Sequence, residues 1–128
     1  MMEKKNQNKQ TGSTGEEVAA NFLLSCGYRI LERNFRCKGG EIDIIAFAPK
    51  ECSLIFVEVK ARRSTAYGLP QQAVNHFKQR QVCKAALTWL AKTGQQEHNA
   101  RFDVVAILLS PDGRHQIEHI QNAFELAY

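Results

Sequence analysis

Apolar positions follow two different spacings along this chain, and these spacings divide it into helical and strand segments. Between residues 18 and 26, and again between 74 and 89, apolar side chains recur every three or four positions, as on one face of a helix. Elsewhere they form short runs or alternate with polar residues, which is typical of strands. The pattern predicts helices over residues 13–26 and 70–93, strands over 28–35, 41–47, 54–60, 101–109 and 115–120, and a short helical turn over 122–128.

The lengths of the connections predict how these elements pair. The loop over residues 48–53 contains Pro49 and is short, so the strands on either side of it should form an antiparallel hairpin. The long second helix joins the third and fourth strands as a crossover, so those two strands should be parallel. The order α-β-β-β-α-β-β therefore predicts an α/β fold, with a mixed sheet flanked by helices.

The first helix is expected to begin at a polar cap. Ser13 or Thr14 suits the N-cap position, and two acidic residues follow in the first turn. At about 100° per residue, Glu17 falls opposite the apolar stripe, whereas Glu16 falls at its margin and can reach the sheet. Residues 1–12 are polar and rich in lysine, and they are predicted to be a disordered basic tail that precedes a single domain over residues 13–128.

The second helix carries a cation on its buried side. Pro70 is expected at its first turn, and Phe77 and Trp89 are expected in its apolar stripe. Lys78 falls within that stripe, where a lysine either extends its ammonium group into solvent or points at an anion.

The segment before this helix is expected to be an exposed basic loop. Arg62, Arg63 and Tyr67 lie in it, next to the strand that ends at residue 60. These side chains are candidates for contacts with phosphates or for stacking on a base, and an ordinary basic loop is the alternative.

Composition limits the class of protein. The chain has 128 residues with 44% hydrophobic content, which suits one domain, and its net charge of +4 with a pI near 9.0 is compatible with a polyanionic partner. Its four cysteines form no C-x-x-C pair and are expected to be free thiols in a reducing cytosol. No signal peptide or membrane span is expected, so the predicted location is cytoplasmic. The four histidines are scattered and are expected at the surface.

Acidic residues inside apolar strands are the exceptional feature of this sequence. Asp43 lies within Gly40-Glu41-Ile42-Asp43-Ile44-Ile45, and Glu58 lies within Val57-Glu58-Val59-Lys60. Strand alternation puts each acid on one face of its strand. If residue 47 opposes residue 54 in the hairpin, then Asp43 opposes Glu58 and Glu41 opposes Lys60, with Cβ atoms about 5 Å apart.

Two opposed carboxylates repel each other unless they share a proton or hold a cation. Their oxygens suit Mg²⁺ or Mn²⁺, and Lys60 could hold a water molecule or offset charge on a phosphate. This layout fits metal-assisted hydrolysis of a phosphodiester. The alternative is a cross-strand ion network that pairs Glu41 with Lys60, and Asp43 with Arg62 or Lys78.

Asp43 and Glu58-Val59-Lys60, with fourteen residues between them, resemble the PD-(D/E)xK signature of the restriction-endonuclease-like superfamily, although the proline is absent. A longer set of motifs is similar to the YraN family of small bacterial proteins, which is related to archaeal Holliday-junction resolvases. The similarity covers roughly residues 12–125. The set is Gly15-Glu16, Gly40-Glu41-Ile42-Asp43, Phe56-Val57-Glu58-Val59-Lys60, Arg62, Tyr67-Gly68, Lys78 and Arg101-Phe102-Asp103-Val104-Val105.

The resemblance implies a restriction-endonuclease-like core and roles for the matching residues. Asp43 and Glu58 would be metal ligands, Lys60 the catalytic lysine, Glu16 a supporting acidic ligand and Lys78 a basic residue near the site. The function implied is a Mg²⁺- or Mn²⁺-dependent endonuclease acting on DNA rather than RNA, on branched or structured DNA in repair or recombination, with a homodimer as one arrangement. The alternatives are a nucleic-acid-binding module that does not cleave, and an interaction subunit whose charges are structural.

Overall fold

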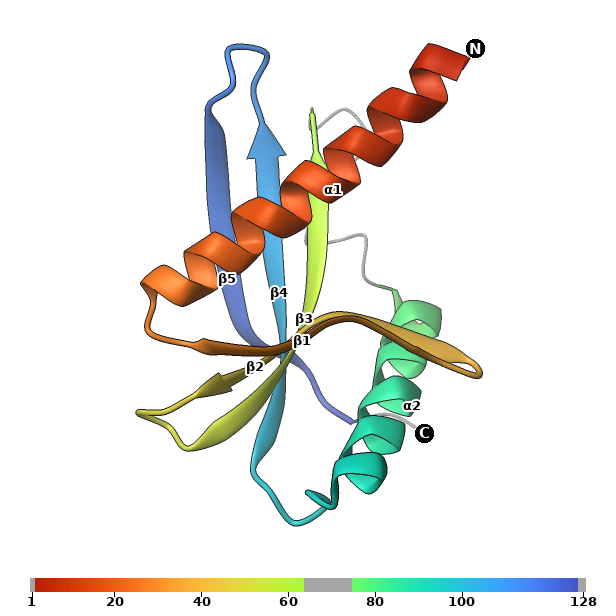
Figure 1. Cartoon of the computed structure of the whole chain (residues 1–128), viewed down its shortest axis with the longest axis vertical. Coiled ribbons are helices and arrows are strands. Elements are labelled where there is room, and N and C mark those ends of the chain that lie inside the picture. The colour runs from red at the N-terminus through yellow and green to blue at the C-terminus, as the bar shows by residue number, and fades with distance from the viewer. Residues whose placement is uncertain (1, 64–74, 127–128) are drawn as a thin grey trace.

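The fold is built on one five-stranded mixed sheet in the strand order β1-β2-β3-β4-β5 (Figure 1). The computed structural model describes the backbone of residues 2–63 and 75–126, and the side chains of residues 14–63 and 75–126. The strands are β1 Arg29–Cys37, β2 Gly40–Ala48, β3 Ser53–Arg62, β4 Ala100–Leu109 and β5 His115–Phe124, and the helices are α1 Met2–Ser25 and α2 His76–Thr93.

The predicted topology is confirmed. β2 and β3 form an antiparallel hairpin, and β3 and β4 are parallel neighbours on either side of the segment that contains α2. β1 and β5 are antiparallel edge strands. The predicted element order and the α/β class therefore match the structure.

Each face of the sheet is covered by one helix. α1 lies across one face (Figure 1), where Ala19 and Leu23 belong to the same buried cluster as Ile44 and Val57. α2 lies on the other face, where Trp89 belongs to a second buried cluster. The central strands are therefore buried on both sides, as their apolar runs predict.

α1 begins earlier than its sequence predicts. The helix starts at Met2, so Ser13 and Thr14 lie inside it, and residues 2–12, expected to be a disordered tail, are helical. No proline interrupts this stretch, which contains three Lys and two Gln, and these residues are compatible with a helix. Adding turns to an existing helix is also cheaper than nucleating one, and the packed half of α1 supplies the existing helix.

α2 begins later than predicted. Asn75 caps it, and its side-chain oxygen accepts a hydrogen bond from the Lys78 backbone N–H at 2.9 Å. Pro70 lies outside the described residues. Phe77, expected in the core, is 64% exposed, because the buried face is centred on positions such as Val82 and Trp89, from which Phe77 is turned well away.

The C-terminal segment also differs from its prediction. A helical turn was expected from Asn122, but β5 continues to Phe124. Asn122 has a left-handed backbone (φ 52°), and its N–H donates to Asp103 Oδ1 at 3.0 Å. Phe124 then stacks on Phe102 with ring centroids 5.0 Å apart. These two tertiary contacts favour the strand over a local helical turn.

Two glycines let the helices approach the sheet closely. A Cβ added at Gly15 of α1 would lie 2.4 Å from Ala61 Cβ on β3, and one added at Gly40 of β2 would lie 2.2 Å from the Gln81 carbonyl oxygen on α2. Neither position has room for a methyl group. The two contacts lie on opposite faces of the sheet, near the acidic residues that the sequence singles out.

Gly15→Ala is expected to destabilise the protein by about 1–3 kcal/mol, although the same change in an exposed helix stabilises by up to about 1 kcal/mol. Urea unfolding measures the difference. Combining it with Ala61→Gly removes the atom that the new methyl group meets, so the double variant should recover part of the loss. Additive effects of the two substitutions would contradict this account of the contact.

Candidate carboxylate site

The hairpin that carries the acidic residues has the predicted register up to the site. Ile44 pairs with Val57, and Phe47 pairs with Leu54, as strand alternation requires. Beyond Ile44 a side chain takes over the pairing, because the Val59 backbone N–H donates to Asp43 Oδ2 at 2.8 Å. β2 parts from β3 at this point and stays paired with β1.

Glu58 follows directly on β3 and is one of the most deeply buried charged residues in the described part of the chain. Its side chain is 3% exposed. Oε1 lies 3.8 Å from Lys60 Nζ and 3.5 Å from Lys78 Nζ. Oε2 is buried and has no hydrogen-bond partner, which is a costly state for a carboxylate oxygen.

Burial and nearby negative charge shift the pKa values of both acids in the same direction. Burial, and then the charge of Asp43, raise the pKa of Glu58 from 4.5 to about 7. Burial also raises the pKa of Asp43, although the hydrogen bond from Val59 and the charge of Lys78 oppose the rise. Burial therefore favours the protonated form of both carboxyl groups, although Lys60 and Lys78 oppose this effect.

Lys78 extends from α2 to the carboxylates, as its position in the apolar stripe predicts. Its side chain is 20% exposed, and Nζ donates to Glu41 Oε1 at 3.1 Å. Burial disfavours the charged ammonium group, but Glu58 and Glu41 together raise the pKa of Lys78 above its ordinary value. Lys78 thus links the carboxylates of Glu41 and Glu58.

The predicted opposition of Glu41 and Lys60 is wrong. Glu41 pairs instead with Lys78 and, at 3.5 Å, with Arg36 Nε on β1. The reason is the parting of the strands at Asp43, which carries Glu41 away from β3 and towards α2. Within the described residues, Lys60 forms its ion pair with Glu58.

Glu16 reaches the same region from α1, on the other face of the sheet. Burial and the charge of Asp43 raise the pKa of Glu16, while a hydrogen bond from the Asn34 side chain and the charge of Arg33 oppose the rise. Arg33 Nη2 lies 4.0 Å from Glu16 Oε2 and its Nη1 lies 2.8 Å from Glu17 Oε1. Glu16 is therefore close enough to Asp43 for their charges to interact, as the margin position on the helical wheel suggests.

The expected basic loop is only partly described. β3 runs two residues past Lys60, so Arg62 is its last residue and is half-buried, and Arg63 follows it and is exposed. Tyr67 lies outside the described residues. Arg62 thus belongs to the strand rather than to a loop, and strand alternation places it on the same face as Lys60.

The oxygens at this site fit a small divalent cation of the magnesium class. Within residues 14–63 and 75–126, no group of three or more His, Cys, Asp or Glu side chains is arranged to hold a metal ion. Asp43 and Glu58 form a two-carboxylate site, and Mg²⁺ commonly uses one or two carboxylates and keeps several waters. The partnerless Glu58 Oε2 is an available ligand atom.

A second buried acid, Asp103 on β4, belongs to a different network. It is 0% exposed, and it accepts hydrogen bonds from the Asn122 N–H and from two nitrogens of Arg101. His119 Nε2 lies 2.7 Å from its Oδ2. Burial opposes ionisation, but His119 and Arg101 hold the pKa of Asp103 below its ordinary value.

All four histidines were expected at the surface, and for His119 this prediction is wrong. Its side chain is 10% exposed, and its ring packs edge-on against Phe22 and Tyr28. The sequence carried a signal for this network, because Asp103 is an acid inside an apolar strand just as Asp43 is. Alternation also puts Arg101 on the same strand face as Asp103.

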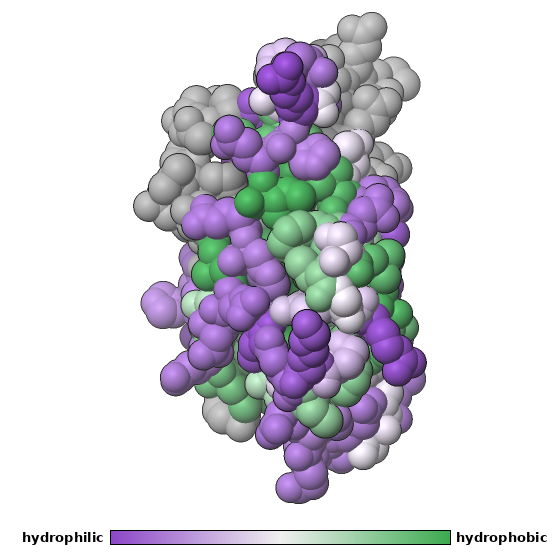
Figure 2. Space-filling view, turned by 90° about the vertical axis from the view of Figure 1, so that its left-hand side faces the viewer, coloured by the Kyte–Doolittle hydropathy of each residue, from purple (hydrophilic) through white to green (hydrophobic). Residues whose placement is uncertain are grey.

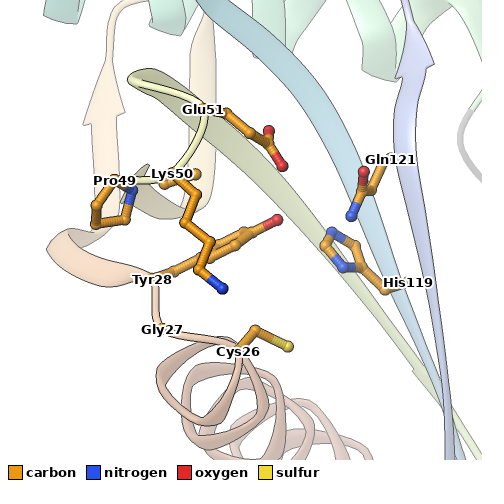
Figure 3. Close-up of a pocket in the computed structure, with 9 residues that line it drawn as sticks. Cys26, Gly27, Tyr28, Pro49, Lys50, Glu51, His119 and Gln121 are labelled. Atoms are coloured by element: carbon orange, nitrogen blue, oxygen red, sulfur yellow. The ribbon is translucent and has the colours of Figure 1, made fainter.

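A cavity of about 380 Å³ lies beside this network, between the end of α1, the β2–β3 loop and β5 (Figure 3). Tyr28, Glu51 and His119 line it. Arg101 donates to the Tyr28 hydroxyl at 2.7 Å and is ion-paired with Glu51. Hydrophobic and hydrophilic residues are interspersed on this side of the molecule (Figure 2). The charges of this network neutralise one another. Its contacts connect α1, β4 and β5.

The fold and the site define a class of protein: a small mixed α/β protein with a carboxylate–lysine cluster between two helices. The family described as "Uncharacterised protein family UPF0102" matches residues 15–107. UPF0102 proteins of Pelobacter propionicus and Geobacter sulfurreducens are 67% and 59% identical over 121 and 122 residues, which cover 94% of this chain in both cases and 86% and 93% of the relatives. A UPF0102 protein of Caldanaerobacter subterraneus is 42% identical over 123 residues, 94% of this chain and 99% of the relative.

The chain therefore belongs to the UPF0102 family, which confirms the resemblance to YraN proteins. The matched residues 15–107 include Glu16, the carboxylates of β2 and β3, and Lys78, but they end within β4, before His119. In the described part of the chain, neither helix has the length and apolar character needed to cross a membrane.

Glu58→Gln is expected to change how stability depends on pH. A carboxyl group whose pKa is 4.5 when unfolded and about 7 when folded binds its proton more tightly in the folded state, so stability is lost as pH rises from 4.5 through 7. The variant does not titrate, so at pH 8 its free energy of unfolding should exceed that of the original protein by roughly 1–3 kcal/mol, with near equality at low pH. Urea unfolding with chelator across this range tests it, with Glu118→Gln on β5 as control. Parallel curves for original and Glu58→Gln proteins would refute the assignment.

Asp103→Ala is expected to destabilise the protein by about 3–5 kcal/mol at pH 7, because it breaks a buried network and removes the carboxylate that Arg101, His119 and the Asn122 N–H share. Because the pKa of Asp103 is lower in the folded protein, its carboxylate stabilises the fold fully above pH 3.8, its ordinary pKa. This stabilisation is lost as the pH falls through the pKa of the folded state. Denaturant unfolding measures both effects. Asp112→Ala, in the exposed turn before β5, should cost less than about 1 kcal/mol. Equal losses in the two variants would show that the Asp103 network contributes little.

Proposed function

We propose that this protein is a metal-dependent nuclease that hydrolyses phosphodiester bonds. One observation supports the proposal above all: the buried Glu58 has an oxygen without a hydrogen-bond partner. This carboxylate lies close to that of Asp43 on β2 and to Lys60 on its own strand. A site that only stabilised the fold would be expected to satisfy its buried oxygens, as the Asp103 network does. An unsatisfied, repelling carboxylate pair is a common feature of functional sites.

Each residue has a role that follows from its place. Asp43 and Glu58 would hold the cation, with Glu16 as a supporting acid near Asp43. A cation bound there would lower the pKa of a bound water molecule and stabilise charge on the phosphoryl oxygens. Lys60, fixed by its ion pair with Glu58, would orient the attacking water or neutralise the developing negative charge. Lys78, Arg62, Arg63 and Tyr67 would contact the nucleic acid.

The proposed substrate is DNA, with branched or otherwise structured DNA of repair or recombination as the leading class. The net charge of +4 favours a polyanion. The order α1-β1-β2-β3-α2-β4 agrees with the core of the restriction-endonuclease-like superfamily, and the D…ExK spacing resembles its signature. Mg²⁺ or Mn²⁺ is the proposed cofactor.

A nucleic-acid-binding module that does not cleave is the second candidate. It is favoured by the ion pairs that Lys78 forms with both Glu41 and Glu58, since these partly neutralise the cluster without a metal. It is also favoured by the lack of a third ligating side chain in the described residues. Cleavage separates the two candidates.

Asp43→Ala and Lys60→Ala are each expected to reduce Mg²⁺-dependent cleavage by at least a hundredfold, in line with the loss of groups that act only on the transition state. The substrates are duplex, flap, single-stranded and four-way DNA, with RNA for comparison, in Mg²⁺ and in Mn²⁺. Asp112→Ala is the matched control and should cleave normally. Circular dichroism checks that each variant is folded.

Two outcomes would reject the nuclease proposal. Cleavage that persists in both variants would place the activity elsewhere, and DNA binding without cleavage in either metal would support the non-cleaving module. Calorimetry of the original protein with Mn²⁺ gives a second readout, because a non-catalytic charge network predicts no binding.

A further inference from the structure

A recess of about 300 Å³ lies beside the carboxylate cluster, between the β1–β2 turn and α2. Figure 1 shows this turn extending to α2. The recess is lined by Arg36, Gly39, Gly40, Glu41 and Gln81, among others. It has no role in the chemistry proposed above.

Glycine makes the recess possible. Gly40 allows the start of β2 to contact the backbone of α2 at Gln81. Gly39 has φ 86°, a left-handed conformation that favours glycine. Side chains at these two positions would fill or strain the turn, so the backbone itself forms part of the wall.

The side chains around the recess are mainly cationic. Arg36 is exposed and projects from β1, and Lys84 of α2 lies against the turn, with Nζ 3.5 Å from where a Gly39 Cβ would be. Lys38 adds an exposed charge in the turn. The one acid in the lining, Glu41, is already ion-paired with Arg36 and Lys78. Lys38 and Lys84, beside the lining, give this region more cations than acids, which favours an anion.

The position of the recess relates it to the proposed nuclease site. Glu41 lines the recess, and Lys78 joins Glu41 to Glu58 through contacts of 3.1 Å and 3.5 Å. Consecutive nucleotides of one DNA strand are about 3.4 Å apart along the helix axis. A phosphate in the recess would therefore lie on the same strand as a phosphate at the carboxylates and close to it.

We propose that this recess binds a backbone phosphate of the nucleic acid, flanking the bond held at Asp43 and Glu58, through Arg36 and Lys84. The inference rests on the proposed function for its ligand, a nucleic-acid strand. Arg36 presents a planar guanidinium group that matches a phosphate, and Lys84 adds a point charge. Gln81 also lines the recess.

The experiment measures DNA binding without metal, by fluorescence anisotropy of labelled duplex and four-way DNA in chelator over a range of salt concentrations. Arg36→Gln and Lys84→Gln should each weaken binding about fivefold to tenfold. Losing the phosphate contact should also reduce the slope of log K against log salt by about 0.9 on duplex. Arg36→Lys should keep most of the slope, because it keeps the charge.

The matched controls remove the same charges elsewhere. Arg114→Gln lies in the turn before β5, and Lys50→Gln lies in the β2–β3 loop at the other cavity. If the Arg36 and Lys84 variants have the same affinity and salt slope as these controls, or if the original protein does not bind DNA, the recess is not a phosphate site and the inference is overturned.

The same set of proteins separates this inference from the nuclease proposal. Reduced slopes in the recess variants, with no cleavage by the original protein in Mg²⁺ or Mn²⁺, would support the phosphate site and reject the nuclease. Cleavage by the original protein, with recess variants that bind DNA like the controls, would support the nuclease and reject the phosphate site.

Discussion

The hydrogen bond from the Val59 N–H to the Asp43 carboxylate determines the shape of the site. In a regular hairpin a backbone carbonyl would accept that bond and the two strands would stay together. Here a side chain accepts it, and the residues of β2 that precede Ile44 are no longer paired with β3. Glu41 is consequently carried to α2, while Glu58 and Lys60 remain on β3. The separation of Glu41 from Lys60 follows from this one substitution of a side chain for a backbone group.

The two buried acidic centres show why burial alone does not identify a functional site. Asp103 and Glu58 are similarly enclosed, and the sequence presents both as acids within apolar strands. Asp103 has hydrogen bonds on both oxygens, and the pKa of its carboxyl is lowered. Glu58 keeps one oxygen without a partner, and its pKa is raised. A satisfied buried charge stabilises the fold, whereas an unsatisfied one leaves room for a ligand.

Strand alternation and helical wheels predicted much of this architecture from the sequence. The long crossover connection predicted the parallel pairing of β3 and β4. Alternation and the wheels predicted the hairpin register as far as Ile44 and Val57 and the approach of Lys78 to the acids. These features depend on local periodicity, which a sequence displays directly. The predicted ion pair of Glu41 and Lys60 failed because alternation assumes that the strands stay paired.

The burial of His119 and the exposure of Phe77 were missed for related reasons. His119 is buried because Asp103, sixteen residues away on the neighbouring strand, accepts its hydrogen bond. Phe77 is exposed because α2 presents a narrower buried face to the sheet than its apolar residues suggest. Each depends on a tertiary contact between elements, and no spacing within one element encodes it.

The strands alone do not complete the cluster, because two of its charged residues come from the helices that pack closely on the sheet. Gly15 allows α1 to contact β3 at Ala61, and Glu16 is the next residue along that helix. Gly40 allows α2 to contact β2, and Lys78 lies one turn before Gln81 on that helix. The strand pair therefore receives an acid from one face and a lysine from the other. The lysine lies on the α2 side of the sheet, and the recess formed by the β1–β2 turn, which Gln81 of α2 lines, lies on that same side.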